Sequence, residues 1–165
     1  MQSAPIAKNE RERLQKVLEL GILDTEPEES FDVITKEAQN IFKVPIATVT
    51  IIDEKREWYK SCQGLNAKEA PREISFCAHA MLSETVFIIE DTLKDSRFRD
   101  NPMVMGEPYI RFYAGVSLHN KDFVSIGVFC VKDTKPRIFS TTEIGKLLEL
   151  ASRAEIELNK ERKSQ

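Results

Sequence analysis

The chain has 165 residues, of which 41% are apolar and 31% charged, with a formal net charge of −3. That length fits a single domain, and the balance of charge excludes a nucleic-acid-binding protein, which needs clustered Lys and Arg. No apolar run approaches the ~18 residues of a membrane span, and the first residues lack the pattern of a secretory signal. The three cysteines are too widely spaced for a disulfide framework, so we expect a cytoplasmic protein that contacts no membrane.

Two helices are predicted at the start of the chain, after a flexible N-terminus of residues 1–8. Asn9 can cap the first helix, and Gly21 supplies its left-handed end. The second helix opens after Thr25, which has the spacing of a capping box, and Pro45 prevents it from continuing. Its apolar residues recur at helical spacing and define one buried face: Phe31, Ile34, Ala38, Ile41 and Phe42.

Strands follow, interrupted by one short helix and one irregular segment. The strands are rich in β-branched and aromatic residues and are bounded by polar turns, which is typical of β-structure. Ser75 can cap a short helix over 76–83, and the polar segment 91–108 matches no regular element. The predicted strands are 44–52, 57–62, 86–89, 110–118 and 123–132.

The order of these elements predicts an α+β fold with a central antiparallel sheet. Most consecutive strands follow one another without the helical crossovers that a doubly wound parallel sheet needs. Helices from the two ends of the chain can then pack together on one face of the sheet. The opposite face is left to residues 64–83 and 91–108, and because irregular chain packs less completely than a helix, we expect a small-molecule pocket there.

Nine short motifs follow one another along the chain: Gly21–Thr25, Pro45–Ala47, Ile52–Asp53, Pro71–Arg72, Ser75–Ala80, Asp95–Phe98, Asn101–Pro102, Arg111–Gly115, and Cys130–Asp133 with Pro136–Arg137. Together they resemble the GAF family, in the branch found beside bacterial histidine kinases, diguanylate cyclases and phosphodiesterases. The likeness runs from about residue 11 to 158, and we expect a single GAF domain over 9–163. The resemblance implies a sheet ordered 2-1-5-4-3, terminal helices on one face, and loops with a short helix over a ligand cavity on the other, but no particular ligand or cofactor.

Two candidate ligand contacts lie on the predicted short helix. Cys77 falls in its first turn, where the helix dipole lowers the pKa of a thiol, but we favour a small buried hydrophobe, as free cysteines usually are. His79 either contacts a ligand or packs with its ring bonded to a carbonyl, and both interpretations stand. Two residues apart on a helix, these side chains cannot pair, and without a second Cys/His pair at ligand spacing we expect no metal site.

Two arginines are candidate contacts for a charged ligand. Arg97 belongs to a loop in which Asp and Arg alternate, and such residues more often bond the loop's own backbone. Arg111 lies in a predicted strand, so it is either an anion anchor in the pocket or an ion pair with Asp91 or Asp95. Aromatic residues near this face favour a flat or ring-containing ligand, and the aromatic candidates are Trp58, Phe76, Phe98 and Tyr113.

The last helix predicts a dimer. It opens with a capping box of Ser140 and Glu143, and its apolar stripe has heptad-like spacing to Leu158, beyond what one sheet face needs. Charged, helix-favouring residues continue to Lys163. We therefore expect a homodimer through the terminal helices, which can also bias an attached effector domain or a partner kinase or cyclase.

Three functions fit these patterns. The leading prediction is a sensory domain without enzyme activity, in which a bound small molecule or partner changes the packing of the terminal helices. The alternative is a GAF-fold thiol enzyme such as a free methionine-R-sulfoxide reductase, although the motifs around Cys62, Cys77 and Cys130 do not match that enzyme's. The third is a dimerisation module with no ligand. The signatures of cyclic-nucleotide-binding and bilin-binding GAF domains are incomplete or absent.

Overall fold

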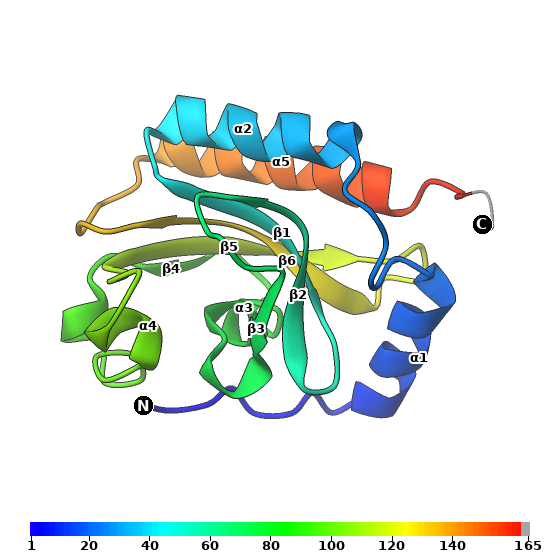
Figure 1. The fold of residues 1–165 in the computed structure, drawn as a ribbon, viewed down its shortest axis with the longest axis horizontal. Helices are drawn as coiled ribbons and strands as arrows, with labels where there is room; N and C mark the ends of the chain where they lie inside the picture. Colours follow the sequence, from blue (N-terminus) through cyan, green and yellow to red (C-terminus); the bar gives the residue numbers. More distant parts are fainter. Residues whose placement is uncertain (163–165) are drawn as a thin grey trace.

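A single antiparallel sheet lies at the centre of the computed structural model, which describes residues 1–162 (Figure 1). Its order is β3-β2-β1-β6-β5-β4, which is the predicted 2-1-5-4-3 arrangement with one three-residue edge strand, β3, added. The predicted fold is therefore confirmed, while Lys163, the predicted end of the domain, lies outside the described residues. The strands are β1 (Ile46–Ile52), β2 (Arg56–Gln63), β3 (Glu69–Pro71), β4 (Phe87–Ile89), β5 (Phe112–His119) and β6 (Ser125–Asp133).

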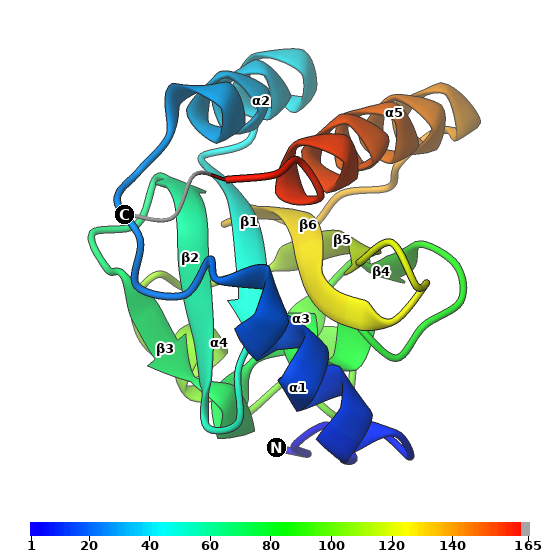
Figure 2. The ribbon, with the colours of Figure 1, turned by 90° about the vertical axis from the view of Figure 1, so that its right-hand side faces the viewer.

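Two long helices, α2 (Glu29–Phe42) and α5 (Thr141–Leu158), lie side by side over one face of the sheet (Figures 1 and 2). Ser140 caps α5 with the predicted capping box, since its hydroxyl accepts from the Glu143 amide at 3.2 Å. Most of the predicted stripe on α5 packs into the core, where Leu147, Ala151, Ala154 and Leu158 are buried, whereas Leu148 is 45% exposed. Because Leu158 is fully buried, a dimer through the terminal helices would have to use other residues, and it stays a prediction.

The second helix begins three residues later than predicted. Residues 25–28 stay outside the helix because the buried ammonium of Lys60, on β2, uses the groups that would cap it. Its Nζ lies 2.8 Å from Thr25 Oγ1, 2.6 Å from the Glu26 carbonyl and 2.6 Å from the Glu28 carboxylate. A tertiary contact therefore overrides the local capping-box signal.

Helix α1 (Glu10–Leu20) lies apart from α2 and α5, at the end of β1 and β6 (Figure 2). It ends at Gly21 in the left-handed conformation, with φ of 64°, as predicted. Arg13 is buried and donates to the Ile52 carbonyl at 2.7 Å, which fastens the helix to the end of β1. Residues 1–8, expected to be flexible, are hydrogen-bonded along the same side, for example from the Gln2 amide to the Arg97 carbonyl at 2.9 Å.

The other face of the sheet is covered by short elements. These are α3 (Phe76–Ala80), α4 (Pro102–Met105) and the 3₁₀ turns η1 (Arg72–Ile74) and η2 (Thr92–Lys94). Ser75 caps α3 as predicted, but α3 ends at Ala80, and the polar segment 91–108 contains η2 and α4, which the sequence did not indicate. Within residues 1–162, no helix has both the length and the hydropathy needed to cross a membrane.

Candidate functional site

Polar side chains line the sheet face beneath α3. In the ladder, Thr48 of β1 lies opposite Cys130 of β6, and Ile46 lies opposite Lys132, so alternate residues of both strands point to this face. Strand β2 adds two more side chains to the same face. All of these residues are buried, and we call them the polar cluster: Thr48, Thr50, Glu57, Tyr59, Cys130 and Lys132.

Two charged members of the polar cluster have no hydrogen-bond partner within the described chain. Both carboxylate oxygens of Glu57 and the Nζ of Lys132 are unpartnered, and both side chains are 0% exposed. Burial lowers the pKa of Lys132, but electrostatic interactions with Glu57, Cys130, Tyr59 and Cys77 together outweigh it and raise that pKa well above its ordinary value. Burying a charge without hydrogen bonds costs several kcal/mol, so two such groups on one face mark a binding site rather than a stabilising core.

Thiols and hydroxyls form a connected chain in the middle of the polar cluster. The Tyr113 hydroxyl donates to Cys77 Sγ at 3.1 Å, and Cys77 Sγ donates to Cys130 Sγ at 3.6 Å. Thr48 Oγ1 lies 3.1 Å from Cys130 Sγ and 2.7 Å from Thr50 Oγ1. Cys77, one of the predicted candidates, is therefore buried beside the polar cluster, and burial raises the pKa of its thiol.

The structure brings most of the predicted aromatic candidates together, but they contact one another instead of lining open space. Phe76 stacks on Phe98 with ring centroids 4.6 Å apart and on Tyr113 at 5.4 Å, and none of the three is more than 1% exposed. His79 meets Phe98 edge-on at 4.8 Å, and its Nε2 lies 2.9 Å from the Gln2 carbonyl. On the face where we expected a small-molecule pocket, these aromatic candidates therefore form a packed cluster next to the buried charges.

Three predicted candidates do not belong to the polar cluster, because one lies on the opposite face of the sheet and two form hydrogen bonds within the protein. Trp58 points to the opposite face and packs in the core beneath α2, because it pairs with Ile51, whose side chain also points there. Arg97 is held by Asp95, with Nη2 to Oδ2 at 2.7 Å. Arg111 is neither the anion anchor nor the ion pair proposed from sequence, since it precedes β5 and donates to the carbonyls of Val104 and Ile110 at 2.9 and 3.1 Å.

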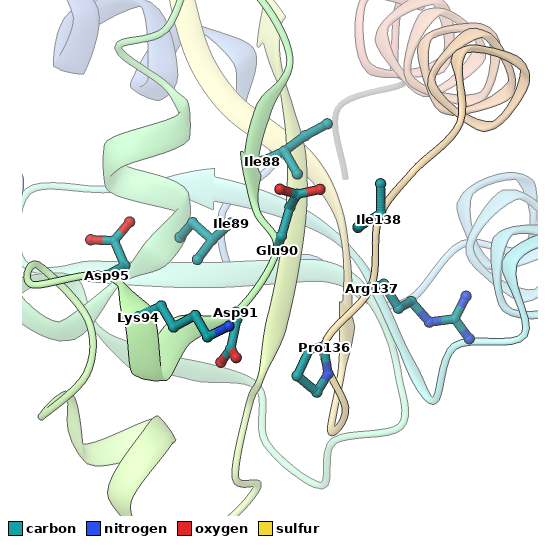
Figure 3. Close-up of a pocket in the computed structure, with 9 residues that line it drawn as sticks. All are labelled: Ile88, Ile89, Glu90, Asp91, Lys94, Asp95, Pro136, Arg137 and Ile138. Carbon is teal, nitrogen blue, oxygen red and sulfur yellow. The ribbon is translucent and has the colours of Figure 1, made fainter.

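A separate groove of about 690 Å³ runs beside β4 and the segment before α5 (Figure 3). Most of its charged side chains already form hydrogen bonds within the protein. Arg137 points away from the groove and donates to the carbonyls of Phe42 and Lys43, and Asp91 accepts from the Leu93 amide. The polar cluster, with its unpartnered charges, is therefore the stronger candidate site. The groove is lined by Ile88, Ile89, Glu90, Asp91, Lys94, Asp95, Pro136, Arg137 and Ile138.

The chain's family is shown by a match of the GAF domain model to residues 26–158. The chain belongs to the GAF domain family. It is also 42% identical, over 137 residues, to a cyclic di-GMP phosphodiesterase of Pseudomonas aeruginosa, a match that covers 83% of this chain and 23% of the relative. This domain therefore spans about a quarter of that relative's length, in agreement with the bacterial branch indicated by the motifs.

Solved structures of the same fold are more distant in sequence. The GAF domain of an Acinetobacter phosphoenolpyruvate-protein phosphotransferase superposes with a TM-score of 0.64 at 18% identity, covering 92% of this chain and 94% of that one. A free methionine-R-sulfoxide reductase of Neisseria meningitidis, in complex with its substrate, gives 0.63 at 17% identity, with 96% of each chain covered. These likenesses establish the shared fold.

The expectation that the protein is not an enzyme is contradicted by the comparison with the Pseudomonas aeruginosa relative. The 42% identical relative is named a cyclic di-GMP phosphodiesterase, so enzymatic activity occurs among related proteins. Within residues 1–162, no group of three or more His, Cys, Asp or Glu side chains is arranged to hold a metal ion.

Proposed function

We propose that this domain is a sensory module that binds a small polar molecule at the polar cluster beneath α3. The observation that carries the proposal is the pair of buried, unpartnered charges, Glu57 and Lys132. A ligand that satisfies both presents a hydrogen-bond donor or cation to the Glu57 carboxylate and an acceptor or anion to the Lys132 ammonium. A zwitterionic or strongly dipolar small molecule has that chemistry.

The sheet provides a short path from this site to the helices. Side chains of β1 alternate, so Thr48 and Thr50 face the polar cluster while Val49 and Ile51 pack beneath α2. Strand β2 is also hydrogen-bonded to α2, with Ser61 Oγ 2.6 Å from Asp32 Oδ1. A ligand that shifts these strands by a fraction of an ångström therefore changes the packing of α2 and α5.

The output that we propose is control of cyclic di-GMP hydrolysis. It is supported by the name of the Pseudomonas aeruginosa relative, a cyclic di-GMP phosphodiesterase, and by the 42% identity in this region. To test it, cyclic di-GMP hydrolysis is measured in the intact gene product for the wild type, for Glu57→Leu combined with Lys132→Met, and for the exposed control Lys68→Met. Coupling between sites of this kind is typically roughly fivefold or more, so the double variant should change turnover by about that factor.

Equal hydrolysis rates in the three proteins, each shown to be folded, would contradict a regulatory role for the site. Absence of cyclic di-GMP hydrolysis from all three would instead contradict the proposed output. The experiment therefore distinguishes a failure of the proposed ligand site from a failure of the proposed output.

A homodimer through the outer surfaces of α2 and α5 is the second part of the proposal. Val33 is 49% exposed and Ile156 is 61% exposed, and both line one groove between the two helices. A second copy that pairs there would remove this apolar surface from water. Because Leu158 belongs to the core, Ile156 is the residue to change.

Ile156→Glu is expected to shift sedimentation velocity from dimer to monomer without loss of helical circular dichroism, because a carboxylate cannot be buried in an apolar interface. The control is Ile138→Glu, at an isoleucine that is 81% exposed and does not line the groove that contains Val33 and Ile156. A wild-type protein that is monomeric at high concentration, or an Ile156→Glu dimer, would remove the proposed interface.

A further inference from the structure

Two thiols far apart in the sequence lie in contact beneath α3. Cys77 Sγ, in the first turn of α3, is 3.6 Å from Cys130 Sγ in the middle of β6, and neither side chain is exposed. The remaining thiol, Cys62, is half-buried on β2, with Sγ 3.8 Å from the Leu65 carbonyl. We propose that Cys77 and Cys130 form a reversible disulfide in response to a peroxide, which fastens α3 to the sheet.

The hydrogen bonds assign different roles to the two sulfurs. Cys130 Sγ accepts a hydrogen bond from the Cys77 thiol and lies 3.1 Å from the Thr48 hydroxyl. Cys130 is therefore the acceptor in this hydrogen-bonded pair of sulfurs, and Cys77 is the donor. Burial raises the pKa of Cys130, but the hydrogen bond from Cys77, the charge of Lys132 and the hydroxyl of Thr48 together lower it to about 7. Cys130 is therefore the nucleophile, and Cys77 is the resolving thiol.

Tyr113 reaches Cys77 because Gly115 leaves room for it. Gly115 lies opposite Cys130 in the ladder, and a Cβ at that position would be 2.5 Å from the Tyr113 hydroxyl oxygen. The phenol therefore lies along the strand over the glycine and donates to Cys77 Sγ at 3.1 Å. This fixes the Cys77 sulfur against Cys130, which is the alignment that a thiol–disulfide reaction needs.

The chemistry balances with a hydroperoxide as the oxidant. The Cys130 thiolate attacks one peroxide oxygen, the O–O bond breaks, and the products are Cys130 sulfenic acid and hydroxide, which takes up a proton to become water. The Cys77 sulfur then attacks the Cys130 sulfur, the S–O bond breaks, and the leaving hydroxide takes the Cys77 proton. Two thiols lose two electrons, hydrogen peroxide becomes two waters, and the sulfurs approach by about 1.5 Å to reach bonding distance.

The test is oxidation of the folded protein with hydrogen peroxide, followed by unfolding, alkylation of remaining thiols and mass spectrometry of non-reduced peptides. Wild type and Cys62→Ser are expected to yield one crosslinked species that joins the peptides of Cys77 and Cys130, and reductant should reverse it. Cys77→Ser should accumulate the sulfenic acid at Cys130, detected with dimedone. Amide hydrogen exchange of α3 should slow on oxidation in wild type and stay unchanged in Cys77→Ser.

Other outcomes overturn the proposal in defined ways. Alkylation of all three cysteines after peroxide treatment would show that the pair is inert core. A crosslink that includes Cys62 would place the reactive pair elsewhere. Dimedone labelling of Cys77 in the Cys130→Ser variant, with none on Cys130 in Cys77→Ser, would contradict the assignment of the nucleophile. None of these measurements depends on a ligand at the polar cluster.

Discussion

Replacing both buried charges of the polar cluster, Glu57→Leu together with Lys132→Met, is expected to raise the free energy of unfolding by about 1–4 kcal/mol. Both groups are fully buried and lack hydrogen-bond partners within residues 1–162, so the ligand-free protein bears the full loss of their hydration. Apolar side chains of similar size remove that penalty. The measurement is urea unfolding of the ligand-free protein, analysed at constant m-value.

The single variants should behave in the opposite way. Lys132→Met alone leaves the Glu57 carboxylate buried without its compensating charge, and is expected to lower the free energy of unfolding by about 3–5 kcal/mol. Lys68→Met, on the exposed β2–β3 connection, is the matched control and should change stability by at most about 0.5 kcal/mol. A double variant less stable than the wild type would show that the two charges stabilise the fold, and would remove the main support for a ligand site.

Glu10→Gln is the second substitution with a large expected effect, a loss of about 3–5 kcal/mol in the free energy of unfolding. The Glu10 carboxylate binds two buried guanidinium groups, Arg13 at 2.8 Å and Arg72 at 2.5 Å. Arg13 in turn donates to the Ile52 carbonyl at 2.7 Å. A neutral amide leaves both arginines buried without a negative partner and releases α1 from β1 and η1.

The same contacts predict an acid transition. Burial raises the pKa of Glu10, but hydrogen bonds and charges from Arg13 and Arg72 outweigh it and lower the pKa from 4.5 to about 2. Because the folded-state pKa is the lower one, the stabilisation is fully present above pH 4.5 and is lost as the pH falls towards 2. The shift corresponds to stability of order 3 kcal/mol.

Urea unfolding between pH 7 and pH 2 checks this prediction. Glu10→Gln should lack the part of the acid dependence that Glu10 supplies, whereas Glu12→Gln, at an exposed position of the same helix, should retain it. Parallel pH profiles for Glu10→Gln and the wild type would show that another carboxylate controls the acid transition.

Local patterns were sufficient to predict the fold because the long helices and the main strands each carry a signal in their own sequence. The capping box of Ser140 and the left-handed Gly21 mark helix ends through contacts within a few residues. The start of α2 was predicted wrongly because the Lys60 ammonium donates a hydrogen bond to the Thr25 hydroxyl, and these two residues are 35 positions apart in the sequence. Edge strand β3 has only three residues, too few to show an alternating pattern.

The site was less predictable because it depends on which way each strand faces. The sequence suggested Trp58 as a pocket residue, but the strand register points Trp58 to the helical face and brings its neighbour Glu57 to the polar cluster. A one-residue change of register reverses every side chain, and because β1 and β2 are buried on both faces, no apolar–polar alternation shows which face each residue takes. One feature of the sequence did point to the site: Lys132 lies within the apolar run of the last strand. A charged side chain in a central strand is costly to bury, so it indicates either a partner or a binding site.

The central claim, that Glu57 and Lys132 hold a small polar ligand, is tested most directly by native mass spectrometry of protein purified from the organism that encodes it. The wild type should carry an additional non-covalent mass that is released on denaturation, and Glu57→Leu with Lys132→Met should lack it while remaining folded. The same small-molecule mass on both proteins, or bare protein in both with the double variant less stable than the wild type, would contradict the claim.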